Sequence, residues 1–235
     1  MNTKNDFLKK LKNLKERYYK PILFKFLNPQ EREWVRSIFK DFVVYESDDF
    51  SEYRRVFVSD TDTNPDFEIC RLKTLCKDET ITHRDVLGSI MALGVSREVI
   101  GDIHLVNDEI HIEVVKQMCL YIKELRQIKR NYVHFEQSQD KPVLPDLATE
   151  TISISLDSLR IDAIIAKAFL INREDVKTLV NQDKVKNNFV LVQKHTTICK
   201  PCDIISVRGF GRVVILEILG TSKKQKTRVK CELLR

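Results

Sequence analysis

Apolar side chains recur every three or four positions near the start of the chain. They lie between Asn2 and Lys20, where lysines occupy many of the other positions, and are Phe7, Leu11, Leu14 and Tyr18. This spacing predicts an amphipathic helix that ends at Pro21, because proline cannot continue a helix. A second helix is predicted from Asn28, whose side chain can cap its first turn, to about Phe39.

Two stretches with strand character follow these helices. They span residues 53–59 and 67–75 and are joined by a turn-rich segment, 60–65. Together with the two helices they predict an N-terminal α/β unit over residues 1–75.

A second predicted unit, residues 76–156, begins with a helix that Thr82 can cap, since an acidic residue stands three positions later. Two short strands flank Asn107-Asp108, a residue pair typical of hairpin turns. A polar segment with two prolines, 137–149, is the predicted linker to the rest of the chain.

The third predicted unit, residues 157–235, starts with two short helices, 159–168 and 173–182. Asn172 can cap the second helix, since Asp175 stands three positions later. Five short stretches with strand character follow; they are 184–186, 189–192, 204–207, 212–219 and 228–233. The whole chain is therefore predicted to be an α+β protein of three small modules.

Charge is distributed unevenly along the chain. Residues 158–235 carry 16 Lys and Arg against 7 Asp and Glu, and residues 1–25 carry 8 against 2. The stretch 26–157 carries 16 against 25, although the whole chain has a net charge of +6. Basic ends around an acidic middle suggest separate modules that meet a polyanion, and solvated faces or an anionic membrane surface are the alternatives.

Several classes of protein are excluded by composition. No apolar run is long enough to span a membrane, and the lysine-rich start lacks the apolar core of a signal peptide. We therefore expect a cytoplasmic protein without a membrane partner. The six cysteines are interpreted as reduced thiols rather than a disulfide framework, and are Cys70, Cys76, Cys119, Cys199, Cys202 and Cys231.

Cations occupy the polar faces of the two helices in the third unit and continue into the following turns. The apolar stripes of both helices are predicted to face inward, which leaves these cations outward. The candidate RNA-binding residues are Arg160, Lys167, Arg173, Lys177, Lys184, Lys186, Asn188, Arg208 and Arg212. A secondary basic strip comprises Lys223, Lys224, Lys226 and Arg228. Arg and Lys suit phosphates, while Asn188 can both donate and accept toward a 2′-hydroxyl or a base edge. Asp162 is expected either to orient Arg160 or to close the helix hairpin.

Four segments of the third unit follow a spaced pattern of charged and apolar positions. They are Leu159-Arg160-Ile161-Asp162, Arg173 with Val176 and Leu179-Val180, Val185-Lys186-Asn187-Asn188, and Pro201 to Val207. The pattern resembles the S4 RNA-binding module, which implies a two-helix hairpin packed on a small sheet. The chain differs from the usual residues of that module at Asp183, Asn187 and Cys202.

Further segments extend the resemblance over most of the chain. They are Phe26-Leu27-Asn28-Pro29, the run 82–89 with Leu93-Gly94, Ile100-Gly101-Asp102-Ile103, Arg208-Gly209-Phe210-Gly211-Arg212, and Lys223-Lys224. In this order they resemble the bacterial YlmH family, from which Ser51-Glu52-Tyr53 departs. The resemblance implies an N-terminal α/β domain, an RRM-like middle domain and a C-terminal S4 domain. It also implies binding to the 50S ribosomal subunit, with rRNA and tRNA as partners, and a part in ribosome-associated quality control.

Motifs that would indicate catalysis are incomplete. The run 83–85 resembles the kinase catalytic loop, but the other kinase motifs are absent. The run 208–213 lacks the aromatic residues of an RRM platform, and the Cys-x-x-Cys at 199–202 lacks two further zinc ligands at regular spacing. We therefore expect a monomeric, non-catalytic protein with no cofactor or metal. A protein-interaction adaptor that uses the acidic middle, for instance in cell division, and an RNA-modifying enzyme remain the alternatives.

Overall fold

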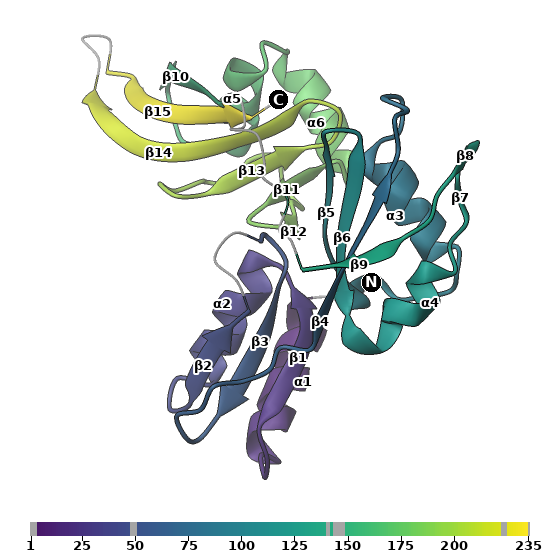
Figure 1. The fold of residues 1–235 in the computed structure, drawn as a ribbon. Coiled ribbons are helices and arrows are strands. Elements are labelled where there is room, and N and C mark those ends of the chain that lie inside the picture. Colours follow the sequence, from purple (N-terminus) through teal and green to yellow (C-terminus); the bar gives the residue numbers. More distant parts are fainter. Residues whose placement is uncertain (1–3, 48–50, 140–141, 143–148, 222–224, 235) are drawn as a thin grey trace. The chain divides into compact units, whose positions relative to one another are not determined.

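A computed structural model describes residues 4–47, 51–139, 142, 149–221 and 225–234 (Figure 1). The described residues form six α-helices and four antiparallel sheets, so the expected mixture of helices and strands is confirmed. The chain divides into two compact units, residues 1–145 and 146–235. The division into three modules stays a prediction.

The first unit begins with a three-stranded sheet in the order β1-β3-β2 and two helices. Its elements are α1 (Lys4–Glu16), β1 (Ile22–Leu27), α2 (Pro29–Ile38), β2 (Val43–Glu46) and β3 (Arg54–Ser59). Leu11 of α1 and Val35 of α2 are fully buried in the same core as Val56 of β3. The predicted cap of α2 is present, because the Asn28 side chain accepts from the Glu31 amide at 3.0 Å and the Glu31 carboxylate accepts from the Asn28 amide at 2.9 Å.

A four-stranded sheet in the order β5-β6-β4-β9 completes the first unit. Its elements are β4 (Ile69–Leu75), α3 (His83–Met91), β5 (Ile100–Val106), β6 (Glu109–Val115), α4 (Cys119–Lys123) and β9 (Glu136–Ser138). The remaining elements are the 3-10 turns Arg97–Val99 and Lys116–Met118 and the ribbon of β7 (Gln127–Ile128) and β8 (Asn131–Tyr132). Thr82 caps α3 as expected, and the β5–β6 turn residues Asn107 and Asp108 both have positive φ.

The strand pairing of β4 corrects the sequence prediction. Residues 67–75 were assigned to the first small unit together with strand 53–59, but β4 pairs with β6 and β9. The reason is that Cys70 and Leu72 alternate into the core that also holds Ile110 and Ile112. A boundary after Leu75 would therefore cut β4 from its sheet.

One pair of cysteines also differs from expectation. Cys70 and Cys119 form a disulfide whose Cα atoms are 5.9 Å apart, whereas the sequence predicted reduced thiols. These residues are 49 positions apart, and only the packing of α4 against β4 brings them together. The other four cysteines are free.

The second unit is a six-stranded antiparallel sheet with two helices on one face (Figure 1). Its strands are β10 (Thr149–Leu156), β11 (Val185–Asn187), β12 (Val190–Leu191), β13 (Ile204–Val207), β14 (Gly211–Thr221) and β15 (Thr227–Leu234), in the order β10-β15-β14-β13-β11-β12. The helices are α5 (Ile161–Ala168) and α6 (Arg173–Asn181). Because β10 pairs with β15 along its whole length, the predicted boundary at residue 156 would cut this sheet. Most of the predicted linker, 137–149, lies outside the described residues.

Each helix in the described part of the chain is too short or too polar to cross a lipid bilayer.

Candidate nucleic-acid interface

The α5–α6 pair is anchored by buried apolar side chains. Every residue of α5 except Ala166 and Lys167 is buried. Val176 and Val180 of α6 are buried in the same core. The remaining face of the pair is polar, with Lys167 and Arg173 exposed and Lys177 half-buried. The side chain of Asn172 caps α6 by accepting from the Asp175 amide at 2.8 Å, as the sequence predicted.

Arg160 is bound to a carboxylate rather than standing alone. Its Nε and Nη2 atoms donate to the two oxygens of Asp162 at 3.1 and 2.6 Å. Burial by itself would raise the pKa of Asp162, but the Arg160 hydrogen bonds and positive charge hold that pKa below its usual value. The expected orienting role of Asp162 therefore agrees with the geometry.

The other predicted cations fall into a paired and an unpaired group. Lys177 donates to Glu174 at 2.7 Å, and Lys226 lies 3.3 Å from Asp157. The guanidinium group of Arg212 lies 5.8 Å from the centre of the Phe189 ring. Within the described residues, the predicted cations without a side-chain hydrogen bond or ion pair are Lys167, Arg173, Lys184, Lys186, Arg208 and Arg228. Lys223 and Lys224 lie outside the described residues. Unpaired cations can meet a polyanion without first breaking a contact within the protein.

Asn188 has a structural role that the sequence analysis missed. Its side-chain amide donates to Asp203 at 2.8 Å, and its side-chain oxygen accepts from the Ile204 amide at 2.9 Å. The Asp203 carboxylate also accepts from the Lys200 amide and the Asn187 side chain, at 2.9 and 3.2 Å. These bonds hold a turn in which Asn188 has a φ of 47°, so both polar atoms of its side chain are engaged within the protein, and its role as an RNA-reading group stays a prediction.

Strand alternation places two predicted cations on the face of the sheet opposite the helices. Lys186 pairs with Ser206, which pairs with Arg212, so these three side chains share one face. Their strand neighbours Val185 and Val213 are buried in the core beneath α5 and α6. The candidate cations are therefore divided between the helix side of this unit and the opposite face of its sheet.

The turn 208–211 lies beside the helix connection. The ring of Phe210 is 5.7 Å from that of Phe169, the residue that follows α5. The Arg208 amide donates to the Lys184 carbonyl at 2.9 Å, which joins this turn to the segment after α6. The Phe210 ring thus packs against Phe169 while the residue stays 38% exposed. Arg208 therefore lies beside the segment that follows α6.

The two cysteines of the Cys-x-x-Cys segment differ in exposure. Cys199 is buried, which raises the pKa of its thiol to about 12, whereas Cys202 is exposed. Nowhere in the described residues do three or more His, Cys, Asp or Glu side chains gather in a way that could hold a metal ion.

Comparisons with known proteins bear on both units. A family model described as "Putative RNA-binding domain in YlmH" matches residues 63–141, the stretch that contains the four-stranded sheet. The chain is 30% identical over 176 residues to the Ribosome-associated protein quality control protein P2 of Bacillus subtilis (strain 168), which covers 73% of this chain and 68% of that protein. A solved structure, the Cell division protein ylmH from Streptococcus pneumoniae, is 28% identical, covers 57% of this chain and 90% of that chain, and has a TM-score of 0.49.

Proposed function

Since this chain belongs to the YlmH family, we propose that it is an RNA-binding protein that associates with the ribosome. The observation that carries the proposal is the polar face of α5 and α6, where Lys167 and Arg173 are exposed and have no ion-pair partner among the described residues. Cations held on a rigid helix pair suit the regularly spaced phosphates of folded RNA. The role requires no catalytic step and no cofactor.

The proposal includes finer points from the sequence. The second unit is an S4 domain, and its partner is 50S rRNA next to tRNA. The protein acts as a cytoplasmic monomer in the quality control of stalled peptidyl-tRNA complexes. In support, the relative from Bacillus subtilis is named for ribosome-associated quality control.

Co-sedimentation with purified 50S subunits tests this proposal. Replacing Lys167 and Arg173 by alanine should weaken binding about tenfold and flatten the log–log salt slope by about 1.4–1.8, or 0.7–0.9 per lost phosphate contact. The matched control replaces Lys177 and Lys226, which removes the same charge but takes cations that are already paired. Equal losses in both variants, or no loss in the first, would contradict the proposed interface.

A second candidate function, a protein-interaction adaptor, is favoured by the four-stranded sheet. Strands β4, β5, β6 and β9 contain no Phe, Tyr or Trp, so this sheet lacks the usual aromatic stacking platform of an RRM. The face of this sheet opposite its core carries charges of both signs, among them exposed Glu136 opposite Lys73, and Glu113, which binds Arg71 at 2.9 Å. A protein partner that binds the full chain after nuclease treatment and is lost on Glu136→Lys would support the adaptor.

A further inference from the structure

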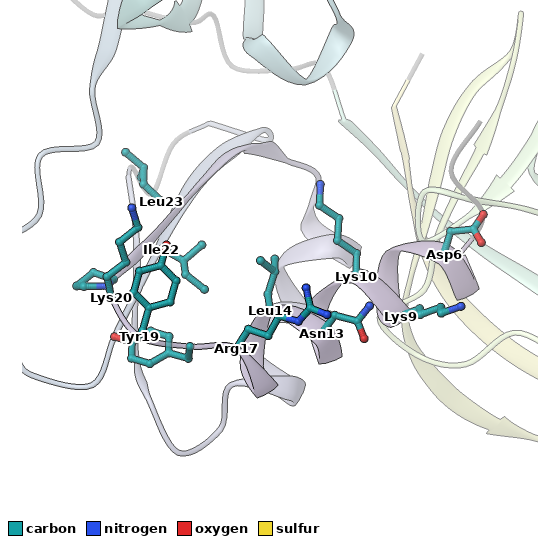
Figure 2. A pocket seen from close by; sticks show the side chains of 12 residues that line it. Asp6, Lys9, Lys10, Asn13, Leu14, Arg17, Tyr19, Lys20, Ile22 and Leu23 are labelled. Atoms are coloured by element: carbon teal, nitrogen blue, oxygen red, sulfur yellow. The ribbon is translucent and has the colours of Figure 1, made fainter.

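A pocket of about 780 Å³ lies in the first unit, where α1 and the connection that follows it meet the start of β1 (Figure 2). Its volume is within the range of about 300–1,000 Å³ that is typical of small-molecule sites, so a nucleotide can enter it. None of its lining residues belongs to the second unit.

The pocket is lined by cations that the protein leaves unpaired. Lys9, Lys10, Arg17 and Lys20 stand against a single acidic residue, Asp6. In the described part of the chain, none of these four cations has a side-chain hydrogen bond or an ion pair. By contrast, Lys15 of the same helix donates to the Ile38 carbonyl and to Asp41, at 2.9 and 3.0 Å. The pocket side of α1 therefore presents positive charge that the fold does not use.

An exposed aromatic ring lies among these cations. The side chain of Tyr19 is 82% exposed, and the ammonium group of Lys20 lies 5.5 Å from the centre of its ring. The preceding residue, Tyr18, is fixed instead by a hydrogen bond to Asp60 and by packing against Phe42. The face of the Tyr19 ring that Lys20 does not cover is thus available to stack on a ligand.

The apolar part of the pocket is recessed. Leu14, Ile22 and Leu23 are each half-buried, and Figure 2 shows Leu14 and Ile22 between the cationic side chains of α1 and Lys20. A surface that inserts into a membrane would project its apolar residues beyond its cations, and here the arrangement is reversed. A base that stacks on Tyr19 can meet these apolar side chains while its phosphates meet the lysines.

We propose that this pocket is a second RNA site, which binds a single-stranded stretch of RNA by stacking on Tyr19 and by phosphate contacts with Lys10 and Lys20. The combination of a positively charged groove with an aromatic ring is typical of proteins that bind single strands without reading their sequence. The inference rests on the proposed RNA-binding function and adds a site that is separate from α5 and α6.

The test measures binding of the full chain to a fluorescent 12-residue oligouridylate by anisotropy over a range of salt concentrations. The variant Lys10→Glu/Lys20→Glu should bind at least tenfold more weakly and flatten the log–log salt slope by about 1.4, which is 0.7 for each single-strand phosphate contact. Tyr19→Ala should weaken binding about tenfold, whereas Tyr19→Phe should keep the affinity because the ring is retained. Unchanged binding in the first two variants would overturn the inference, as would absence of oligouridylate binding by the unaltered chain.

The matched control is Lys12→Glu/Lys40→Glu, which makes the same change of net charge at exposed lysines outside the pocket. If it weakens binding as much as the pocket variant, the effect is one of overall charge and the inference fails. Polyglutamate serves as the competing ligand. If polyglutamate displaces the oligouridylate, and if Tyr19→Ala binds polyglutamate as tightly as the unaltered chain does, the pocket is assigned to an acidic protein segment instead. Co-sedimentation with 50S subunits distinguishes the two proposals. Because the proposed function assigns 50S binding to the α5–α6 face, the pocket variant should still co-sediment with 50S subunits.

Discussion

Arg160 and Asp162 form a two-point ion pair at the start of α5, with Nε–Oδ1 and Nη2–Oδ2 distances of 3.1 and 2.6 Å. The Asp162 side chain is 1% exposed and the Arg160 side chain 35% exposed. A buried carboxylate that is ionised depends on this partner, because its own desolvation is unfavourable. The pair therefore belongs to the packing of α5 as much as to any RNA contact.

The pH dependence of this pair gives the first prediction. The pKa of Asp162 is lowered in the folded protein, so its contribution to stability is present above the unfolded pKa of about 3.9 and is lost as the pH falls through the lower folded value. Asp162→Asn should destabilise the second unit by about 2 kcal/mol at pH 7. The difference from the unaltered protein should shrink below about pH 4. Hydrogen exchange of the α5 amides measures it, and an equal difference at pH 7 and pH 3 would contradict the role of ionised Asp162.

The bond between Asn188 and Asp203 gives the second prediction. Asn188→Ala and Asp203→Ala should each destabilise the second unit by about 1–3 kcal/mol, since each leaves polar groups of the turn unsatisfied. The double variant should lose less than the sum, by about 1 kcal/mol, because both changes break the same bond. Urea unfolding followed by exchange of the β13 amides measures this cycle. A drop in RNA affinity for Asn188→Ala with unchanged stability would instead support its role as an RNA-reading residue.

The division of cations between two faces gives the third prediction. Lys186 and Arg228 are exposed on the sheet face opposite α5 and α6, and neither has an ion pair in the described residues. If RNA lies on the helix face, alanine at both positions should leave the salt slope of 50S binding unchanged. The same charge loss at Lys167 and Arg173 should reduce that slope by about 1.4–1.8. Equal slopes for the two variants would place RNA on both faces.

Local features could be predicted from the sequence with good accuracy. The caps at Asn28, Thr82 and Asn172 depend on residues three positions apart, and all three form as expected. The hairpin turn at Asn107-Asp108 is equally local, because both residues tolerate a positive φ.

Contacts between distant segments could not be predicted in this way. Alternation identifies residues 67–75 as a strand, but their partner depends on which core their buried side chains join. The pairing of Lys177 with Glu174 and of Lys226 with Asp157 likewise decides which cations stay available, and a count of charges does not reveal it. The positions of the candidate cations were readable from the sequence, but their division between two sheet faces required the register of β11, β13 and β14.

The last prediction concerns Gly101, which lies against an aromatic ring from the other sheet of the first unit. A Cβ atom at this position would stand 2.6 Å from Cε1 of Phe26, whose ring is 3% exposed and belongs to the core of the four-stranded sheet. Since this ring cannot swing into solvent, Gly101→Ala should destabilise the first unit by about 1–3 kcal/mol. Fluorescence of Trp34, the only tryptophan, reports the thermal unfolding of this unit.

Gly88 provides the matched control for this substitution. It lies inside α3, and a Cβ atom there would meet nothing within 4 Å. Gly88→Ala should therefore stabilise the first unit by about 0.5–1 kcal/mol, because alanine has the higher helix propensity. Phe26→Leu should recover part of the loss in Gly101→Ala, since the smaller side chain leaves room for the new methyl group. If Gly101→Ala were as well tolerated as Gly88→Ala, the close approach of β1 to β5 would not contribute to the packing of the two sheets.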